Sequence, residues 1–184
     1  VVMDPAASDA SRMAELHSRN WNEMVVFCQH QYNIHLDTCW ALHCTNIGTA
    51  QNVMSSGFLK PGNQVNDLSS TSDRLHVHFA LRLPADVGAE VSGAHVDKKA
   101  WIFMSVFESV CTHGMTVLIA SNACLLTRAP IPIQFLHILD VTNIDEPRYL
   151  NSRKRVTLPV LRDILVVESN RRSVHRDSTT STSS

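Results

Sequence analysis

Apolar residues near the start of the chain recur at roughly helical spacing, after a loose leader of residues 1–8. They are Met13, Leu16, Met24 and Phe27. With Asp9 or Ser11 as the capping residue, this spacing predicts a helix that runs to about His30. Residues 1–34 are therefore expected to form an N-terminal helical segment.

The next stretch, residues 35–45, is denser in apolar side chains and suits a buried strand that ends at His43. A short helix is expected after it, because Asn46 is a favourable N-cap and Gly57 is placed to end the helix. The chain then becomes polar over residues 62–73, which predicts a loop.

The rest of the chain predicts short strands separated by turns. The expected strands are residues 75–79, 101–107, 115–119, 124–127 and 135–141. Short strands with few long helices indicate an α+β fold built on a split or mixed sheet. We expect residues 35–168 to form one domain, followed by a disordered tail at residues 169–184 that is rich in Ser, Thr and Arg. Because the chain begins at Val1 and not at Met, we expect it to be a fragment of a longer protein or the product of an incomplete gene model.

Composition narrows the class of protein. The chain has 184 residues, of which 44% are hydrophobic and 18% charged, as in ordinary globular proteins. This excludes a mainly disordered chain, a collagen-like repeat and a disulfide scaffold. Sixteen Lys and Arg against seventeen Asp and Glu give a net charge of -1, so any RNA or phosphate site must be a local cluster. Arg153-Lys154-Arg155 is one such cluster, although a solvated surface has the same pattern.

The cysteines and the apolar runs indicate a compartment. Five cysteines without CxxC spacing predict free thiols under reducing conditions. The longest apolar runs are far shorter than the roughly 18 residues that a membrane span needs. The first residues of the chain contain no apolar signal core. We expect an intracellular protein, cytoplasmic or nuclear, with no membrane partner.

Ten histidines make metal or nucleophilic chemistry the first candidates. His76 and His78 point to the same side of a strand, which suits a metal, a phosphate or another ligand, but also a merely polar strand face. No HxxxH or HExxH spacing supports a metal, and none is expected. Cys44 beside His43 suggests a nucleophile and its base, yet adjacent strand residues face opposite ways.

Three blocks of sequence, in order, point to a more specific function. They are Leu42-His43-Cys44-Thr45 with Gly57-Phe58-Leu59-Lys60-Pro61, Arg74-Leu75-His76-Val77-His78-Phe79-Ala80, and Ser121-Asn122-Ala123-Cys124-Leu125-Leu126-Thr127. Together they resemble the RNA 2′-phosphotransferase family, NAD-dependent enzymes that remove a splice-junction 2′-phosphate during tRNA splicing. That family carries a His-Gly-Thr strand end, an Arg-x-His-Val-His strand and a late Ser-x-Asn-Gly-Val-x-Leu-Thr block. The resemblance covers about residues 40–140.

The resemblance implies an ADP-ribosyltransferase fold, with a split β-sheet around a cleft that holds NAD. It implies catalytic roles for Arg74, His78 and His95, and cofactor contacts for His43, Thr45, His76, Ser121 and Asn122. The implied partners are NAD and an RNA with an internal 2′-phosphate. In the implied reaction this phosphate attacks the nicotinamide ribose, nicotinamide leaves, and Arg and His donors stabilise the charge on the phosphate oxygens.

The chain also departs from the family pattern. Cys44 and Ala123 stand where the family has glycine, and His95 stands where it has an arginine that matters for catalysis. The family's small N-terminal lobe carries an Arg-His pair, and no such pair occurs before His43. We expect that this lobe either lies upstream of Val1 or is lost. A second hypothesis is therefore a degenerate module that binds NAD, ADP-ribose or RNA ends without turnover. A third is an unrelated α+β domain.

Overall fold

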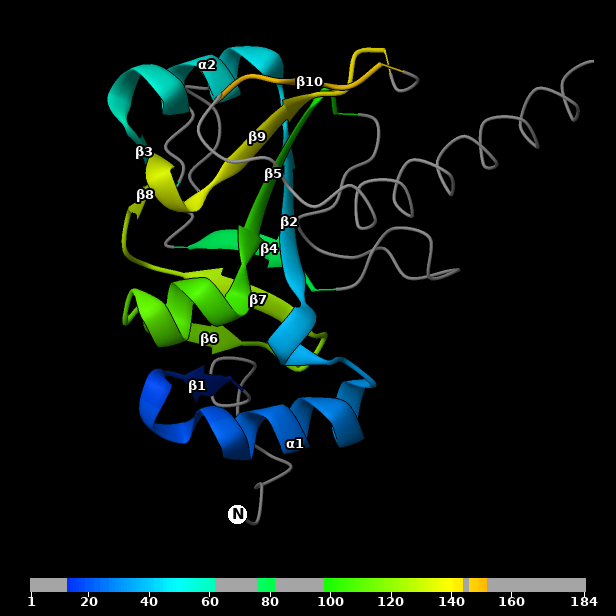
Figure 1. Ribbon diagram of the computed structural model, residues 1–184, viewed down its shortest axis with the longest axis vertical. Coiled ribbons are helices and arrows are strands. Elements are labelled where there is room, and N and C mark those ends of the chain that lie inside the picture. The colour runs from blue at the N-terminus through cyan, green and yellow to red at the C-terminus, as the bar shows by residue number, and fades with distance from the viewer. Residues whose placement is uncertain (1–12, 62–75, 82–97, 144–145, 152–184) are drawn as a thin grey trace, which may run out of the picture.

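The main feature of the fold is a large antiparallel sheet with short helices around it (Figure 1). The computed structural model describes residues 13–61, 76–81, 98–143 and 146–151. The sheet strands are β1 (Ala14–Leu16), β2 (Trp40–Thr45), β4 (Val77–Ala80), β5 (Ala100–Ser105), β6 (Val117–Ile119), β7 (Cys124–Thr127), β9 (His137–Asp140) and β10 (Arg148–Tyr149). Their order across the sheet is β1-β6-β7-β4-β2-β5-β9-β10. The expected mixed α/β class with short strands is confirmed.

The described elements also include two α-helices, a second, two-stranded sheet and several short helical turns. The helices are α1 (Trp21–Tyr32) and α2 (Ile47–Ser56), and the small sheet joins β3 (Phe58–Leu59) to β8 (Ile131–Pro132). Short 3-10 turns lie at Ser18–Asn20, Leu36–Thr38 and Ile133–Phe135, and a π-helical turn lies at Glu108–Thr112. None of the helices described is long and apolar enough to cross a membrane.

The large sheet consists of two halves that meet between β2 and β4. β2 pairs with β5 along its whole length, from Trp40 opposite Ser105 to Thr45 opposite Ala100. Among the described residues, its pairing with β4 is confined to Leu42 opposite Ala80. Figure 1 shows β4, β7, β6 and β1 running crosswise to β2 and β5. The junction between the halves is therefore narrow, and the strands part on either side of it.

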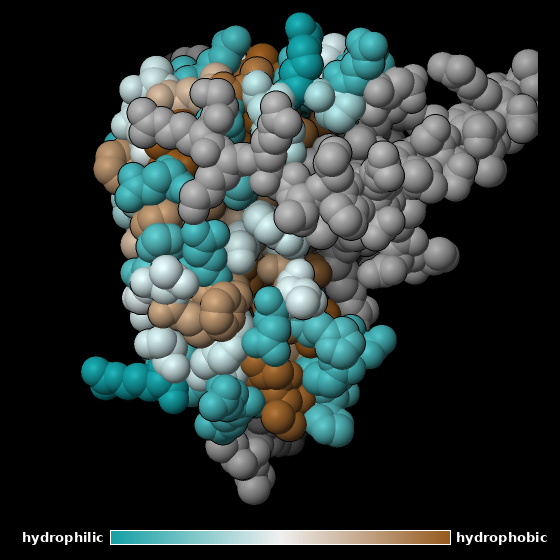
Figure 2. Space-filling view, viewed as in Figure 1, coloured by the Kyte–Doolittle hydropathy of each residue, from teal (hydrophilic) through white to brown (hydrophobic). Residues whose placement is uncertain are grey.

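Alternation along the strands divides the buried side chains between two faces. One face belongs to the main core, which includes Phe79, Ile102 and Leu125 and is joined by side chains of α1 and α2. The other face carries a second cluster, formed by Leu42, Cys44, Trp101, Phe103, Leu139 and Val141. On the outside, Figure 2 shows a small apolar patch over α1 flanked by hydrophilic side chains. Val26 of α1 is among the exposed large apolar residues, which is ordinary for a protein surface.

The N-terminal region differs from the expected helix. Ala14–Leu16 is a strand, with Ala14 opposite Ile119 of β6, and the helix begins at Trp21. Leu16 is fully buried in this pairing. A partner strand some hundred residues away thus overrides the local helical spacing, which is the usual limit of propensity arguments. The helix also runs past His30 to Tyr32, and Asn33 caps it in a left-handed conformation, with its N–H bonded to the carbonyls of Cys28 and Gln29.

Other expected elements are confirmed or shifted at their ends. The helix between Asn46 and Gly57 is confirmed, and Gly57 ends it with a φ of 78°. The strand expected over residues 35–45 begins at Trp40 and continues past His43 to Thr45. The strand expected over residues 101–107 ends at Ser105, where the chain bends toward the π-helical turn. The expected loop at residues 62–73 and the tail at residues 169–184 lie outside the described residues.

The turn between β6 and β7 has a backbone conformation that favours glycine. Ala123 has a φ of 60°, in the left-handed region that L-residues other than Gly rarely adopt. Two features hold it there: its N–H donates to the carbonyl of Ala120 at 2.9 Å, and the side chain of Asn122 accepts from the N–H of Cys124 at 3.1 Å. Position 123 is also one at which the phosphotransferase pattern has glycine.

We predict that Ala123→Gly stabilises the protein, because glycine removes the steric cost of the left-handed conformation. The expected gain in the free energy of unfolding is about 1 kcal/mol, measured by urea denaturation. Ala41→Gly, in the middle of β2 and fully buried, is the matched control and should destabilise the protein. Equal destabilisation by both substitutions would contradict the conformation given for Ala123.

Candidate functional site

His43 lies where the two halves of the sheet part. Its ring packs against Phe79 of β4, with 5.7 Å between ring centroids. Its Nδ1 lies 2.9 Å from the carbonyl oxygen of His78. A carbonyl oxygen accepts and cannot donate, so Nδ1 must carry the proton of this hydrogen bond. In the neutral ring Nε2 is therefore a hydrogen-bond acceptor.

This side-chain bond helps close the junction between β2 and β4. The strands are in ladder register at Leu42–Ala80, and one step further the carbonyl of His78 receives the imidazole N–H of His43. The His43 side chain thus bonds to the backbone of β4 close to the point where backbone pairing between β2 and β4 stops. Such a bond contributes about 1 kcal/mol to stability and costs more when one partner is removed.

His78 itself faces the other side of the sheet, where it lies beside Cys124. The distance from His78 Nδ1 to Cys124 Sγ is 3.9 Å. Cys124 is 1% exposed, and its thiol donates to the carbonyl oxygen of Phe79 at 3.2 Å. A buried thiol whose proton is engaged in this way is a structural group rather than a nucleophile.

Cys44 does not form a dyad with His43. It follows His43 directly on β2, so the two side chains leave opposite faces of the strand. Cys44 belongs to the second cluster, opposite Trp101 of β5. The side chain that replaces the family's glycine is thus packed against the sheet.

His76 pairs with an arginine that the sequence did not single out. The register of Val77 opposite Thr127 brings His76, just before β4, opposite Arg128, just after β7. Arg128 Nε donates to His76 Nε2 at 2.9 Å, so the imidazole is neutral and holds its proton at Nδ1. Burial, and then the positive charge of Arg128, lower the pKa of His76 below its ordinary value.

The predicted site residues lie at two opposite edges of the sheet, each formed by the ends of the strands rather than by an outer strand. Thr45 ends β2, is buried, and lies at the same edge as His76, because β2 and β4 are antiparallel. Ser121 and Asn122 are exposed in the β6–β7 turn, at the opposite edge. The side-chain oxygen of Asn122 is engaged in that turn. Arg74 and His95 lie outside the described residues.

Among the described residues, two buried polar atoms on the strands of this region have no hydrogen-bond partner. They are the indole Nε1 of Trp101, a residue that is 2% exposed, and the hydroxyl of Thr127. Trp101 lies opposite Cys44. Thr127 lies opposite Val77, so its side chain faces the main core, on the other side of the sheet from His76 and Arg128. Buried donors without a partner are rare in native proteins, because leaving such a group unsatisfied is costly.

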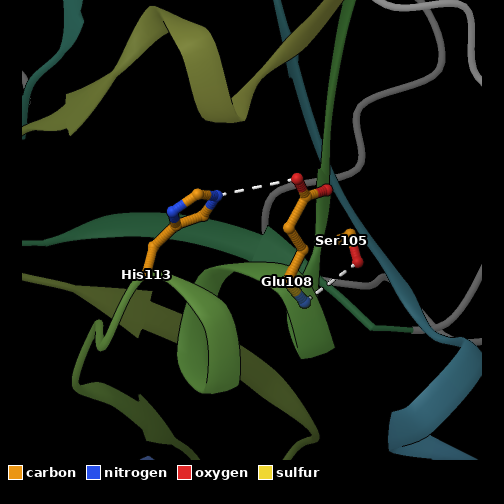
Figure 3. Close-up of polar contacts among 3 residues, drawn as sticks. All are labelled: Ser105, Glu108 and His113. Atoms are coloured by element: carbon orange, nitrogen blue, oxygen red, sulfur yellow. Dashed lines mark hydrogen bonds and ion pairs between the residues drawn. The ribbon is translucent and has the colours of Figure 1, made fainter.

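A second polar group lies around the π-helical turn that follows β5 (Figure 3). The imidazole of His113 is 3.6 Å from the carboxylate of Glu108 and stacks on Phe135, with 4.0 Å between ring centroids. The backbone N–H of Glu108 donates to the hydroxyl of Ser105 at 3.2 Å. Both ionisable side chains are partly exposed, so this pair contributes little to stability.

The cysteines behave as the sequence predicted, since all five are free. Burial raises the pKa of Cys28 to about 11 and that of Cys39 to about 12, which makes both thiols poor nucleophiles at neutral pH. Within the described ranges, His, Cys, Asp and Glu side chains form no cluster suited to a metal ion.

The chain matches no family model, no curated protein and no solved structure. The likeness to RNA 2′-phosphotransferases therefore depends on the three sequence blocks alone. Sequence reasoning missed Arg128 and Trp101. Arg128 follows the third block directly, and only the β4–β7 register reveals that it faces His76.

We predict that the hydrogen bond from His43 Nδ1 stabilises the junction between β2 and β4. His43→Leu removes the donor to the His78 carbonyl and should lower the free energy of unfolding by about 1–2 kcal/mol. His43→Asn places an amide N–H near the position of Nδ1 and should cost clearly less. Urea denaturation measures both, and equal costs would show that this hydrogen bond does not support the junction.

We also predict that Arg128→Ala raises the pKa of His76, because it removes a neighbouring positive charge and opens the imidazole to water. The titration of the His76 ring protons by NMR measures this shift. Arg148→Ala is the matched control, since Arg148 lies beside Asp140 at the far end of the sheet. An unchanged or lower pKa for His76 in Arg128→Ala would contradict the pairing.

Proposed function

We propose that the chain is an NAD-dependent transferase of the ADP-ribosyltransferase type, which transfers an RNA 2′-phosphate to ADP-ribose and releases nicotinamide. The observation that carries the proposal is the position of His43. It lies where the sheet divides, and its tautomer is fixed so that Nε2 accepts a hydrogen bond. A ribose hydroxyl is the kind of donor that this acceptor suits, which is the role the sequence resemblance implies for His43.

Two further observations support the proposal. Ala123 keeps a left-handed backbone where the family pattern has glycine, so the third block keeps a conformation suited to that pattern. The His76–Arg128 pair lies at the end of the strands where β2 also ends. This edge offers donors and positive charge to a phosphorylated ligand.

The proposed chemistry needs positioning more than acid–base catalysis. An oxygen of the RNA 2′-phosphate bonds to C1 of the nicotinamide ribose, the bond from that carbon to nicotinamide breaks, and the electron pair leaves with nicotinamide. The 2-hydroxyl of the same ribose then attacks phosphorus, which gives a cyclic phosphate of ADP-ribose and returns the RNA 2′-hydroxyl. His43 would orient the ribose for both steps, and cationic groups would stabilise the phosphate oxygens.

A second candidate is a module that binds the same ligands without turnover. The observation in its favour is Cys44, whose side chain occupies the second cluster opposite Trp101 where the family pattern has glycine. A side chain at that position limits how closely a ligand approaches the strand. The two candidates share ligand binding and differ in the release of nicotinamide.

We predict that the purified chain binds NAD and ADP-ribose, and that His43→Asn weakens this binding roughly tenfold, as expected for one lost hydrogen bond. Calorimetric titration measures the affinities. His113→Asn is the matched control, since His113 caps the π-helical turn and contacts Glu108 and Phe135, and it should bind as the unmodified chain does.

A nicotinamide-release assay with NAD and a 2′-phosphorylated oligonucleotide then separates the two candidates. Release that His43→Asn reduces supports the transferase, and binding without release supports the module. If the unmodified chain binds neither NAD nor ADP-ribose, both candidates are wrong.

A further inference from the structure

Arg128 forms its side-chain hydrogen bond with an imidazole and not with a carboxylate. Its Nε donates to Nε2 of His76 at 2.9 Å, while the arginine as a whole is exposed. In the part of the chain that the structure describes, no Asp or Glu pairs with it; the ion pairs there are Glu108–His113 and Asp140–Arg148. The charge of the guanidinium is therefore not neutralised by its partner.

The pairing also orients the guanidinium. A free arginine side chain on a surface samples many rotamers, and ordering it costs free energy when a ligand binds. The bond through Nε fixes the inner edge of the planar group, so that the two Nη groups form its outer edge. Paired N–H groups in this fork match two oxygens of a phosphate.

His76 is suited to hold the arginine because it is neutral. An imidazolium has no acceptor and would repel the guanidinium, whereas the Nδ1-protonated tautomer presents Nε2 as an acceptor. Partial burial, and secondarily the charge of Arg128, lower the pKa of His76 and keep this tautomer populated at neutral pH. Among the described residues, the ionisable groups on the same face as the His76 ring are Arg128, which follows β7, and His78, two residues further along the chain in β4.

We propose that Arg128 binds a phosphate ester through its Nη groups and that His76 is the residue that positions it. This inference rests on the proposed function and deepens it by naming a phosphate-binding cation. Arg128 and His76 lie at the sheet edge where β2 ends. The phosphate belongs either to the pyrophosphate of ADP-ribose or to the 2′-phosphate of the RNA, and the experiment distinguishes these two sources.

The test measures dissociation constants for ADP-ribose, for a 2′-phosphorylated oligonucleotide and for the same oligonucleotide without the phosphate. We expect Arg128→Ala to weaken one phosphorylated ligand at least tenfold, and that ligand identifies the source. Arg128→Lys should restore only part of the loss, because an ammonium lacks the fork. Arg148→Ala, with its guanidinium beside Asp140, is the matched control and should bind as the unmodified chain does.

A separate measurement tests whether His76 acts by positioning Arg128 and not only by stabilising the fold. His76→Gln offers an oxygen to Arg128 and should retain most of the affinity, whereas His76→Leu should lose it as Arg128→Ala does. The dependence of log Kd on log salt should also become shallower by roughly one ion in Arg128→Ala and in His76→Leu, as for one lost phosphate contact. Unchanged urea midpoints would show that the variants fold.

The outcomes separate this proposal from the proposed function. If Arg128→Ala binds every phosphorylated ligand within twofold of the unmodified chain while His43→Asn weakens ADP-ribose, the phosphate proposal is wrong and the function stands. If the chain fails to bind NAD and ADP-ribose but binds the phosphorylated oligonucleotide through Arg128, the function is wrong and the phosphate site stands. If none of the phosphorylated ligands binds, both are wrong.

Discussion

The hydrogen bond from the His43 imidazole to the His78 carbonyl is the constraint on which the candidate site depends. β2 is paired with β5 along its whole length but with β4 at Leu42–Ala80 among the described residues. Beyond that pair the two halves of the sheet diverge, and a side chain supplies the next bond across the gap. One interaction therefore both closes the junction and fixes the tautomer of the histidine that lies in it.

Alternation along β4 determines which side of the sheet the other polar groups face. Because side chains alternate along β4, Phe79 packs against His43 on the core face, whereas His76 and His78 lie on the opposite face. His76 then meets Arg128, and His78 meets Cys124. The backbones of His76 and His78 thus lie close to His43, but their rings face the other side of the sheet. A ligand that contacts both sets must lie across the edge where the strands part.

The sequence predicted the elements whose signals are local. The helix between Asn46 and Gly57 was found because its cap and its terminating glycine are short-range features. The strand Cys124–Thr127 was found because its apolar run is short and bounded by turn residues. The strand Ala14–Leu16 was missed, because three residues with one buried side chain become a strand only when β6 is there to pair with them.

The candidate site could be predicted in its residue types but not in its arrangement. The period of two placed His76 and His78 on one side of a strand, and it placed Cys44 away from His43, as the structure shows. Arg128 and the unpartnered indole of Trp101 depend on cross-strand register, which the chain does not encode locally. The left-handed conformation of Ala123 could not be predicted from its residue type, because alanine rarely adopts this conformation.

The most direct test of this account is a long-range nitrogen–proton NMR spectrum of the histidine side chains, recorded with and without ADP-ribose. The account predicts that His43 carries its proton at Nδ1 in the free protein. It also predicts that the Nε2 resonance of His43 shifts when ADP-ribose binds, while the resonances of His113 stay in place. A His43 ring protonated at Nε2, or His43 resonances that do not move at saturating ADP-ribose, would contradict the claim that the sheet junction forms the ligand site.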